Sequence, residues 1–178
     1  DFGEVMIYAP NDQTTISFDG QPNRIIDSNT FLLLRVPYGV LIGGSKPIYA
    51  VASGTINSQD QGAPFFAHIP GPTQFTGGPV IFATGLSDDE NNNMVHFARI
   101  VTVLDNIGKI SIDGWFINGL VYQRMGASNY YYYDAQVTTK SDHKVAASQS
   151  GIKFAVTVYG YGMLRSYAFN PALDLTVT

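Results

Sequence analysis

Apolar and polar residues alternate along many short stretches of this chain, as they do in β-strands whose side chains point in turn to opposite faces. No stretch shows the 3.6-residue period of an amphipathic helix. The clearest alternation lies within residues 151–160, where one face carries Ile152, Phe154, Val156 and Val158, and the other Lys153, Ala155, Thr157 and Tyr159. The pattern therefore predicts an all-β fold.

Other strands are expected where an apolar run is bounded by residues that favour turns. Asp19-Gly20 is a typical hairpin turn, because both residues tolerate a positive φ. The polar segments 53–64 and 87–93 are predicted to be surface loops. The further strands that we expect cover residues 5–9, 14–18, 31–36, 48–52 and 80–84.

One fifteen-residue stretch recurs in the chain. Residues 6–20 align without a gap with residues 100–114, and both copies end on Ile-Ser-apolar-Asp-Gly. A second similarity joins residues 45–54 to residues 151–160. Repetition of this kind indicates two related modules. Chance similarity is the alternative, since any two hairpins share an alternating pattern.

The length of 178 residues allows two small β-sandwiches of about 90 residues each. We expect two tandem antiparallel β-sandwich modules of jelly-roll-like type, the first over residues 1–65 and the second over residues 66–178. Residues 173–178 have strand character and are expected to form a terminal strand. We also expect the chain to be a fragment of a longer protein.

The composition narrows the class of protein. Charged residues make up only 13% of the chain, aromatic residues another 13%, and there are 18 glycines, which favours strands and tight turns. The net charge of −4, with no run of Lys or Arg, predicts that nucleic acid is not a partner. Without cysteine there are no disulfides or thiolate sites. No apolar run reaches the length of a membrane span, so no membrane insertion is expected.

The sequence holds no recognisable catalytic motif, so we expect no enzyme, no catalytic residues, no cofactor and no protein metal centre. His68, His96 and His143 stand apart from one another and are interpreted as structural. Asp19 and Asp113 occupy equal places in the repeat and are interpreted as turn residues. A polysaccharide-acting hydrolase that uses paired carboxylates is the enzymatic alternative.

A calcium site is a minor hypothesis for the most polar loop. Asp88, Asp89 and Glu90, followed by three asparagines, offer the oxygen ligands that calcium prefers. A solvated loop explains the same residues, because no glycine-spaced ligand pattern accompanies them.

Four consecutive tyrosines, Tyr130, Tyr131, Tyr132 and Tyr133, give the strongest indication of contact with another molecule. In a strand, about two of the four must face away from the core. Exposed tyrosine suits a glycan, a neighbouring domain or another copy of the protein. Together with Trp115, these tyrosines form the candidate interaction surface. A strand packed between two sheets is the alternative.

Several segments, in order, resemble the N-terminal domain of the IgGFc-binding protein family, and together they are similar to the later half of that domain. The matching segments are residues 9–16 with the Asp19-Gly20 hairpin, 45–51, 65–75, 108–114, 154–162 and 166–169.

The resemblance implies a non-catalytic β-sandwich module of an extracellular protein, secreted or at the cell surface, used in adhesion or in secreted matrices. Its partners would be other extracellular proteins or copies of itself. One alternative is a subunit of a surface fibre, in which a terminal strand completes the sheet of a neighbour. Another is a carbohydrate-binding module that stacks sugars on Trp115 and the tyrosines.

Overall fold

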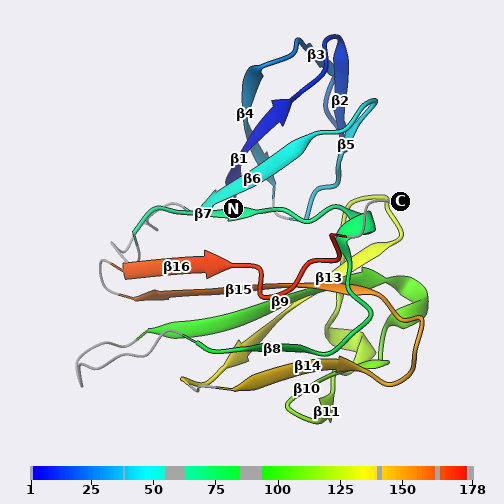
Figure 1. The fold of residues 1–178 in the computed structure, drawn as a ribbon, viewed down its shortest axis with the longest axis vertical. Helices are drawn as coiled ribbons and strands as arrows, with labels where there is room; N and C mark the ends of the chain where they lie inside the picture. Colours follow the sequence, from blue (N-terminus) through cyan, green and yellow to red (C-terminus); the bar gives the residue numbers. More distant parts are fainter. Residues whose placement is uncertain are drawn as a thin grey trace.

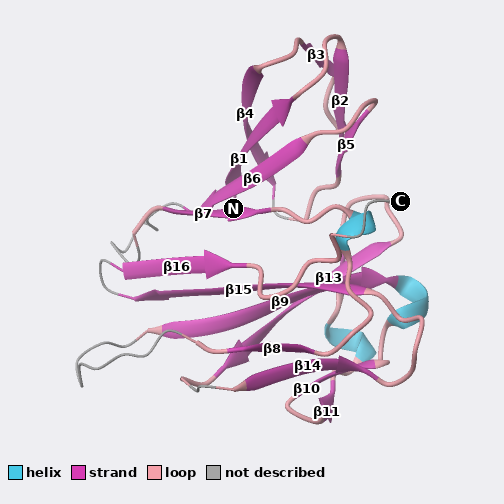
Figure 2. Cartoon of the chain, viewed as in Figure 1, coloured by secondary structure: helices cyan, strands magenta, loops and turns pink. Residues whose placement is uncertain are grey.

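The computed structural model of the chain is all-β, with antiparallel sheets throughout (Figures 1 and 2). In the described part of the chain, the helical elements are three single 3-10 turns: η1 (Pro72–Gln74), η2 (Leu104–Asn106) and η3 (Gly119–Val121). The predicted fold class is confirmed. The structure describes residues 2–37, 39–54, 63–84, 94–139, 142–162 and 165–175.

The first unit is a sandwich of two sheets. Its core holds Val5, Ile7, Ile16, Leu34 and Val36, which come from both sheets and are buried between them. The larger sheet has the order β4 (Thr30–Pro37), β1 (Phe2–Ala9), β6 (Tyr49–Gly54) and β7 (Phe65–His68). The smaller sheet has the order β3 (Arg24–Ile26), β2 (Thr14–Phe18) and β5 (Ile42–Gly44).

The second unit is a larger sandwich with a core of its own, in which Ile100, Ile110, Val145 and Phe154 are fully buried. One sheet has the order β12 (Gln123–Arg124), β13 (Tyr130–Val137), β9 (Val95–Val103), β15 (Phe154–Gly162) and β16 (Arg165–Phe169). The facing sheet has the order β11 (Trp115–Phe116), β10 (Ile110–Ile112), β14 (His143–Ala147) and β8 (Val80–Phe82).

Alternation of apolar and polar residues places the strands as the sequence predicts. Ile152, Phe154, Val156 and Val158 are all buried in the second core, with at most 3% of their surface exposed. Strand β9 alternates between half-buried and buried positions along its whole length. One face of each central strand is therefore packed in the apolar core. Burial of this kind stabilises a fold by about 25 cal/mol for each Å² of apolar surface removed from water.

The two units share one topology. In each, the first strand lies inside the larger sheet, the next two strands lie in the facing sheet, and the chain then returns to the larger sheet. Matched in this way, the strands β1 to β7 correspond in order to β9, β10, β11, β13, β14, β15 and β16. The repeat seen in the sequence is thus a repeat of strand order, with β8 and β12 as additions to the second unit.

The ungapped alignment is wrong by one residue in the first strand. It pairs Ile7, which is buried, with Val101, which lies on the opposite face of its sheet. When buried positions are matched with buried positions, Ile7 pairs with Ile100, and Ile16 still pairs with Ile110. In this matching the second unit has one more residue before its second strand. Because side chains alternate with a period of two, this single residue reverses the faces.

The two units touch along the edge strands β7 and β16, which run side by side in Figure 1. Asn170 Nδ2 donates a hydrogen bond of 2.8 Å to the His68 carbonyl. Ser166 Oγ bonds both the amide and the carbonyl of Ala63. Side chains of the second unit thus satisfy backbone groups beside an open sheet edge, which would otherwise invite pairing with another chain.

A second contact joins the first hairpin to the turn before β13. The amide of Ala127 donates a hydrogen bond of 3.1 Å to Asp19 Oδ2. Gly126 has φ of 54° and lies so close to Asp19 that an added Cβ would overlap the carboxylate. Asp19 therefore contacts the other unit, in addition to its expected place in a turn.

The last described strand, β16, ends at Phe169, and residues 173–175 are not in a strand. The rest of the terminal strand that we expected, residues 176–178, lies outside the described residues.

Candidate functional site

The two most exposed apolar side chains of the second unit, Leu120 and Trp115, lie on one short segment, residues 113–122, here named the Trp115 loop. Asp113 and Gly114 form a two-residue turn between β10 and β11, with φ of 50° and 84°. Positive φ at both central residues is typical of a type I′ hairpin turn, for which Asp-Gly is a favoured sequence. Trp115 is the first residue after the turn and pairs with Ile112.

Asp113 is held in place from strand β14. Its Oδ2 lies 2.7 Å from Nδ1 of His143, and its Oδ1 accepts a hydrogen bond of 2.9 Å from the amide of Lys144. His143 Nε2 lies 2.8 Å from the carbonyl of Thr138, and only 2% of His143 is exposed. Asp113 and the Thr138 carbonyl thus hold the His143 ring from both sides. The contact between Asp113 and His143 fixes the turn that presents Trp115.

The Trp115 loop is anchored by two buried side chains and exposes four apolar ones. Ile117 and Tyr122 are buried, with 6% and 8% exposed. By contrast, the exposed fractions are 81% for Trp115, 62% for Phe116, 91% for Leu120 and 40% for Val121. Four exposed apolar side chains within residues 115–121 indicate a candidate interaction site on the folded surface.

The second half of the Trp115 loop is also well supported. Asn118 caps η3, because its side chain accepts a hydrogen bond of 3.0 Å from the amide of Leu120. A Cβ added at Gly119 would lie 2.9 Å from Cγ2 of Ile107, so this turn packs closely against the chain before β10. The exposed side chains are therefore presented on an ordered backbone, which lowers the entropy lost on binding.

The four tyrosines of β13 divide between the two faces of their sheet. Tyr131 and Tyr133 pack against the core of the second unit, whereas Tyr130 and Tyr132 lie on the outer face. Tyr130 meets Phe75 edge to face, with ring centroids 6.0 Å apart. All four are half-buried. Because Trp115 belongs to the facing sheet, the structure does not gather the five candidate residues on one surface.

Tyr132 lies beside the first unit. A Cβ added at Gly39 would be 3.1 Å from a ring carbon of Tyr132. The Tyr132 hydroxyl donates a hydrogen bond of 2.7 Å to Gln123. The guanidinium of Arg99 lies 5.1 Å from the ring centroid of Tyr132 and 5.7 Å from that of Tyr159, as in cation–π contacts.

Arg99 also forms a two-pronged ion pair with Asp134, with both nitrogen–oxygen distances at 2.8 Å. Burial lowers the pKa of Arg99, but the hydrogen bonds and the charge of Asp134 outweigh this effect and raise it above its ordinary value. The guanidinium is therefore permanently charged. It organises the aromatic side chains of the face that the first unit covers.

The remaining candidates lie apart. Asp19 contacts Ala127, whereas Asp113 contacts His143, so the two carboxylates of the repeat have different surroundings. Within the described residues, no group of His, Cys, Asp or Glu side chains could hold a metal ion. The calcium candidates Asp88, Asp89 and Glu90 lie outside those residues. None of the described helical turns is long and apolar enough to cross a membrane.

His96 makes stability depend on pH. Its Nδ1 lies 2.8 Å from the Tyr167 hydroxyl, its Nε2 lies 3.0 Å from Thr139 Oγ1, and only 2% of it is exposed. Burial, helped by the charge of His143, lowers the pKa of His96 below its ordinary 6.5. As the pH falls, His96 is therefore protonated at a higher pH in the unfolded chain than in the folded protein. The stability that comes from the neutral His96 is thus fully present above pH 6.5 and is lost as the pH falls through the folded-state pKa.

We expect His96→Gln to flatten this decline, because Gln has no proton to take up. The check is urea unfolding of both proteins at several pH values between 7.5 and 5. His68→Gln serves as the control, since His68 is half-buried and shares no bond with His96. An unchanged slope in His96→Gln would assign the acid sensitivity to another group.

Sequence reasoning singled out Trp115 but passed over Phe116, Leu120 and Val121, which are exposed beside it. The sequence does contain a signal for them, because the apolar pair Trp115-Phe116 directly follows the Asp113-Gly114 turn. Few positions beside a surface turn are buried, so an apolar pair there indicates exposed apolar side chains. The link between Asp113 and His143 was also missed, because thirty residues separate the two partners.

A comparison with protein families found a match to the model of the IgGFc binding protein family over residues 3–160. Comparisons with curated proteins and with solved structures found no match. The family match indicates an extracellular protein-binding module and a non-enzymatic family of domains. Because the matched segment covers most of the chain and confirms the resemblance, the chain belongs to the IgGFc-binding protein family.

Proposed function

We propose that this chain is a non-catalytic structural or adhesion module of a secreted or surface protein. The observation that carries the proposal is the Trp115 loop, an ordered segment that exposes four apolar side chains on a rigid sandwich. Aromatic anchors of this kind dominate the binding energy of many protein interfaces. The membership of the chain in a family of extracellular protein-binding modules supports the same function.

We propose the two sandwiches that the sequence predicts over residues 1–65 and 66–178, with the boundary moved to the end of β7 at His68, because β7 pairs with β6 in the sheet of the first unit. The separate cores support this division, since each draws its buried residues from one part of the chain. In this arrangement, Tyr132 packs against the neighbouring module, and Trp115 contacts the external partner. The partners are other extracellular proteins or further copies of the chain.

Carbohydrate binding is the second candidate function, because the exposed indole of Trp115 could also stack on a sugar ring. The apolar neighbours favour a protein, since Phe116, Leu120 and Val121 offer no hydrogen-bonding side chains to sugar hydroxyls. A glycan site needs several polar groups around its stacking platform.

Truncating Trp115 tests the proposed function. We expect Trp115→Ala to weaken binding by about tenfold or more, as loss of an aromatic anchor does, without lowering stability. The measurement is surface plasmon resonance over three immobilised probes: mucin glycoprotein, the same mucin after deglycosylation, and IgG Fc. The last is included because the family carries that name.

Ile81→Ala is the matched control, since Ile81 is 65% exposed on β8, the far edge of the same sheet. Binding that survives deglycosylation and depends on Trp115 supports a protein-binding module. Binding lost on deglycosylation would favour the carbohydrate-binding alternative. Binding that is equal in Trp115→Ala and in the unmodified protein would remove the Trp115 loop from the proposal.

A further inference from the structure

The outer face of the sheet β4-β1-β6-β7 is apolar and uncovered. We name it the apolar sheet face. The strand register places the side chains of this face in rows. Its apolar members are Met6, Tyr8, Phe31, Leu33, Tyr49, Val51 and Phe66. Its four most open members are Phe31 at 65%, Leu33 at 65%, Tyr49 at 58% and Phe66 at 66%.

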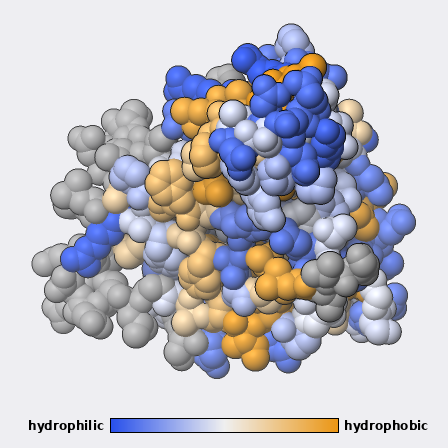
Figure 3. Space-filling view, turned by 45° about the horizontal axis from the view of Figure 1, so that its top comes forward, coloured by the Kyte–Doolittle hydropathy of each residue, from blue (hydrophilic) through white to orange (hydrophobic). Residues whose placement is uncertain are grey.

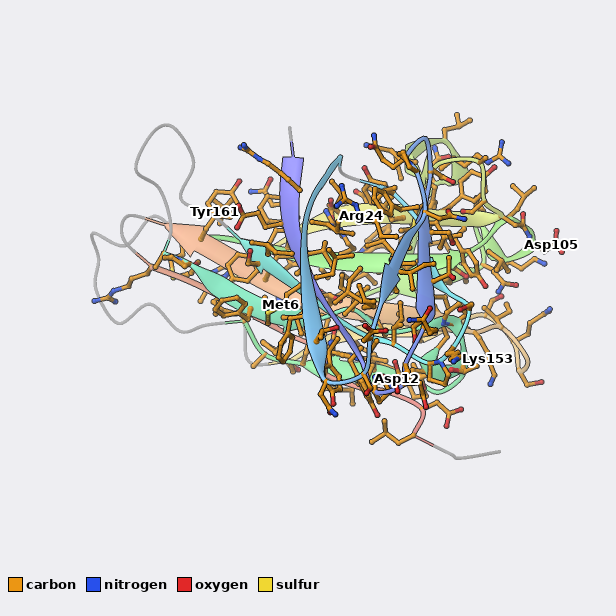
Figure 4. All side chains as sticks on the ribbon, turned by 90° about the horizontal axis from the view of Figure 1, so that it is seen from above. Met6, Asp12, Arg24, Asp105, Lys153 and Tyr161 are labelled. Atoms are coloured by element: carbon orange, nitrogen blue, oxygen red, sulfur yellow. The ribbon has the colours of Figure 1, made fainter. Side chains whose placement is uncertain are left out.

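Figures 3 and 4 show the surroundings of this face. In Figure 4, Met6 lies on the side of its sheet that is turned away from the smaller sheet of the same unit. Apolar surface is also visible on the upper unit in Figure 3. An apolar area of this extent is unusual on a protein that acts alone in water.

The side chains of the apolar sheet face are ordered among themselves. Tyr8 stands between two rings, with centroids 5.2 Å from Phe31 and 6.2 Å from Tyr49. The Tyr8 hydroxyl donates a hydrogen bond of 2.8 Å to Asn29. Two rows further along the strands, Glu4 is the cross-strand neighbour of Arg35. The face therefore has an aromatic row, an aliphatic row and a row with one charge of each sign.

The equivalent face of the second unit is already covered. When Ile7 is matched with Ile100, Phe31 corresponds to Tyr132, which lies against Gly39 of the first unit. Ser166 and Asn170 of that same face also bond to the first unit. In this fold the outer face of the larger sheet is thus a place where another sandwich packs. On the first unit, the described residues leave it open.

We propose that the apolar sheet face is the interface of a homodimer, in which the faces of two copies pack against each other. The two-fold axis runs parallel to the strands, between β1 and β4. Rotation by 180° about that axis places β4 of one copy over β1 of the other. Because the axis is parallel to the strands, each row of side chains faces the same row of the second copy. Leu33 then meets Met6 of the second copy, and Phe31 meets Tyr8.

Charge complementarity favours this axis. It brings Arg35 of each copy over Glu4 of the other, so that two ion pairs form at one edge of the interface. An axis along β1 itself would instead bring the two Glu4 side chains together, which is unfavourable because like charges repel. The face is therefore self-complementary in one arrangement of the two copies, as a two-fold interface requires.

The overlap in this arrangement consists of β4 and β1 from each copy. It covers Phe31, Leu33, Met6 and Tyr8 together with the charged row, whereas Tyr49 and Phe66 on β6 and β7 lie beside it. A large apolar side chain offers roughly 150 to 250 Å², so Phe31 and Leu33 together expose about 250 Å² on each copy. Because a typical specific interface buries about 800 Å² on each partner, we expect a reversible dimer whose arrangement is set by the charged row.

Charge reversal tests the proposal with the whole chain. We expect the unmodified protein to sediment as a dimer at micromolar concentration in analytical ultracentrifugation. Arg35→Glu and Glu4→Lys should each raise the dissociation constant by about tenfold or more, since each places two like-charged pairs across the interface. An equimolar mixture of the two variants should regain the dimer, because both contacts of the mixed pair are then attractive.

Leu33→Lys, in the middle of the face, should give a monomer, whereas the control Ile81→Lys on β8 should not. Circular dichroism melts of all variants show whether each is folded. A monomeric unmodified protein overturns the proposal, whatever other protein or glycan it binds. Failure of the mixture to regain the dimer overturns the two-fold arrangement. Trp115→Ala should leave the dimer unchanged, so this result is independent of the proposed function.

Discussion

Phe154→Ala is expected to lower the free energy of unfolding of the second sandwich by about 3 to 5 kcal/mol, the range for a fully buried phenylalanine. Phe154 is 0% exposed and opens β15 in the middle of the second core. Its own backbone bonds Thr76 in both directions, at 2.9 and 3.0 Å. Because the ring is surrounded on all sides, its removal leaves a cavity that the sheets cannot close.

The measurement is thermal unfolding followed by calorimetry. A loss of this size should lower the transition of a module of about 100 residues by about 12 °C or more. Phe116→Ala is the control, because Phe116 belongs to the same sandwich but is 62% exposed, and a change of less than about 0.5 kcal/mol is expected for it. Equal effects of the two substitutions would contradict the assigned core.

Ile7→Ala is expected to destabilise the first sandwich by about 2 to 5 kcal/mol. Ile7 is 0% exposed and packs with Ile16 and Leu34 between the two sheets of the first unit. This small core has few other fully buried side chains, so one truncation removes a large share of its apolar packing. Its counterpart in the second sandwich is Ile100, which occupies the same place in the topology.

This second prediction also tests the division of the chain near residue 65. Calorimetry of Ile7→Ala should show the transition of the first sandwich moving down while the other transition stays in place, and Phe154→Ala should show the reverse. Ile25→Ala, at a position 64% exposed on β3, is the control. A single transition that both substitutions lower equally would mean that the chain unfolds as one domain.

Many of the strands could be predicted from the sequence, because a buried strand face leaves a two-residue period that needs no knowledge of partners. The prediction for residues 151–160 is confirmed residue by residue in β15 and the chain before it. The repeat was also visible, since strand, turn and Asp-Gly corner recur in order. Its register was wrong at the first strand, because one additional residue in a turn is invisible to an ungapped comparison.

The sites were less predictable. Four tyrosines in a row had to divide between two faces of a sheet, but the sequence could not show that Tyr132 would meet Gly39 of the other unit. The apolar sheet face escaped notice because its members sit on four strands that are separated along the chain. Each strand alone looks like an ordinary strand with one apolar face, and only pairing assembles the exposed side chains into an area.

By itself, the sequence determined the class of the fold, the positions of many strands and the tight turn at Asp113-Gly114, since all of these depend on neighbours within a few residues. The tertiary structure decided which outer face is covered, which one stays open, and how Asp113, His143 and Trp115 form one site. These contacts join residues that are far apart along the chain. Their formation depends on strand order and register, which local alternation does not specify.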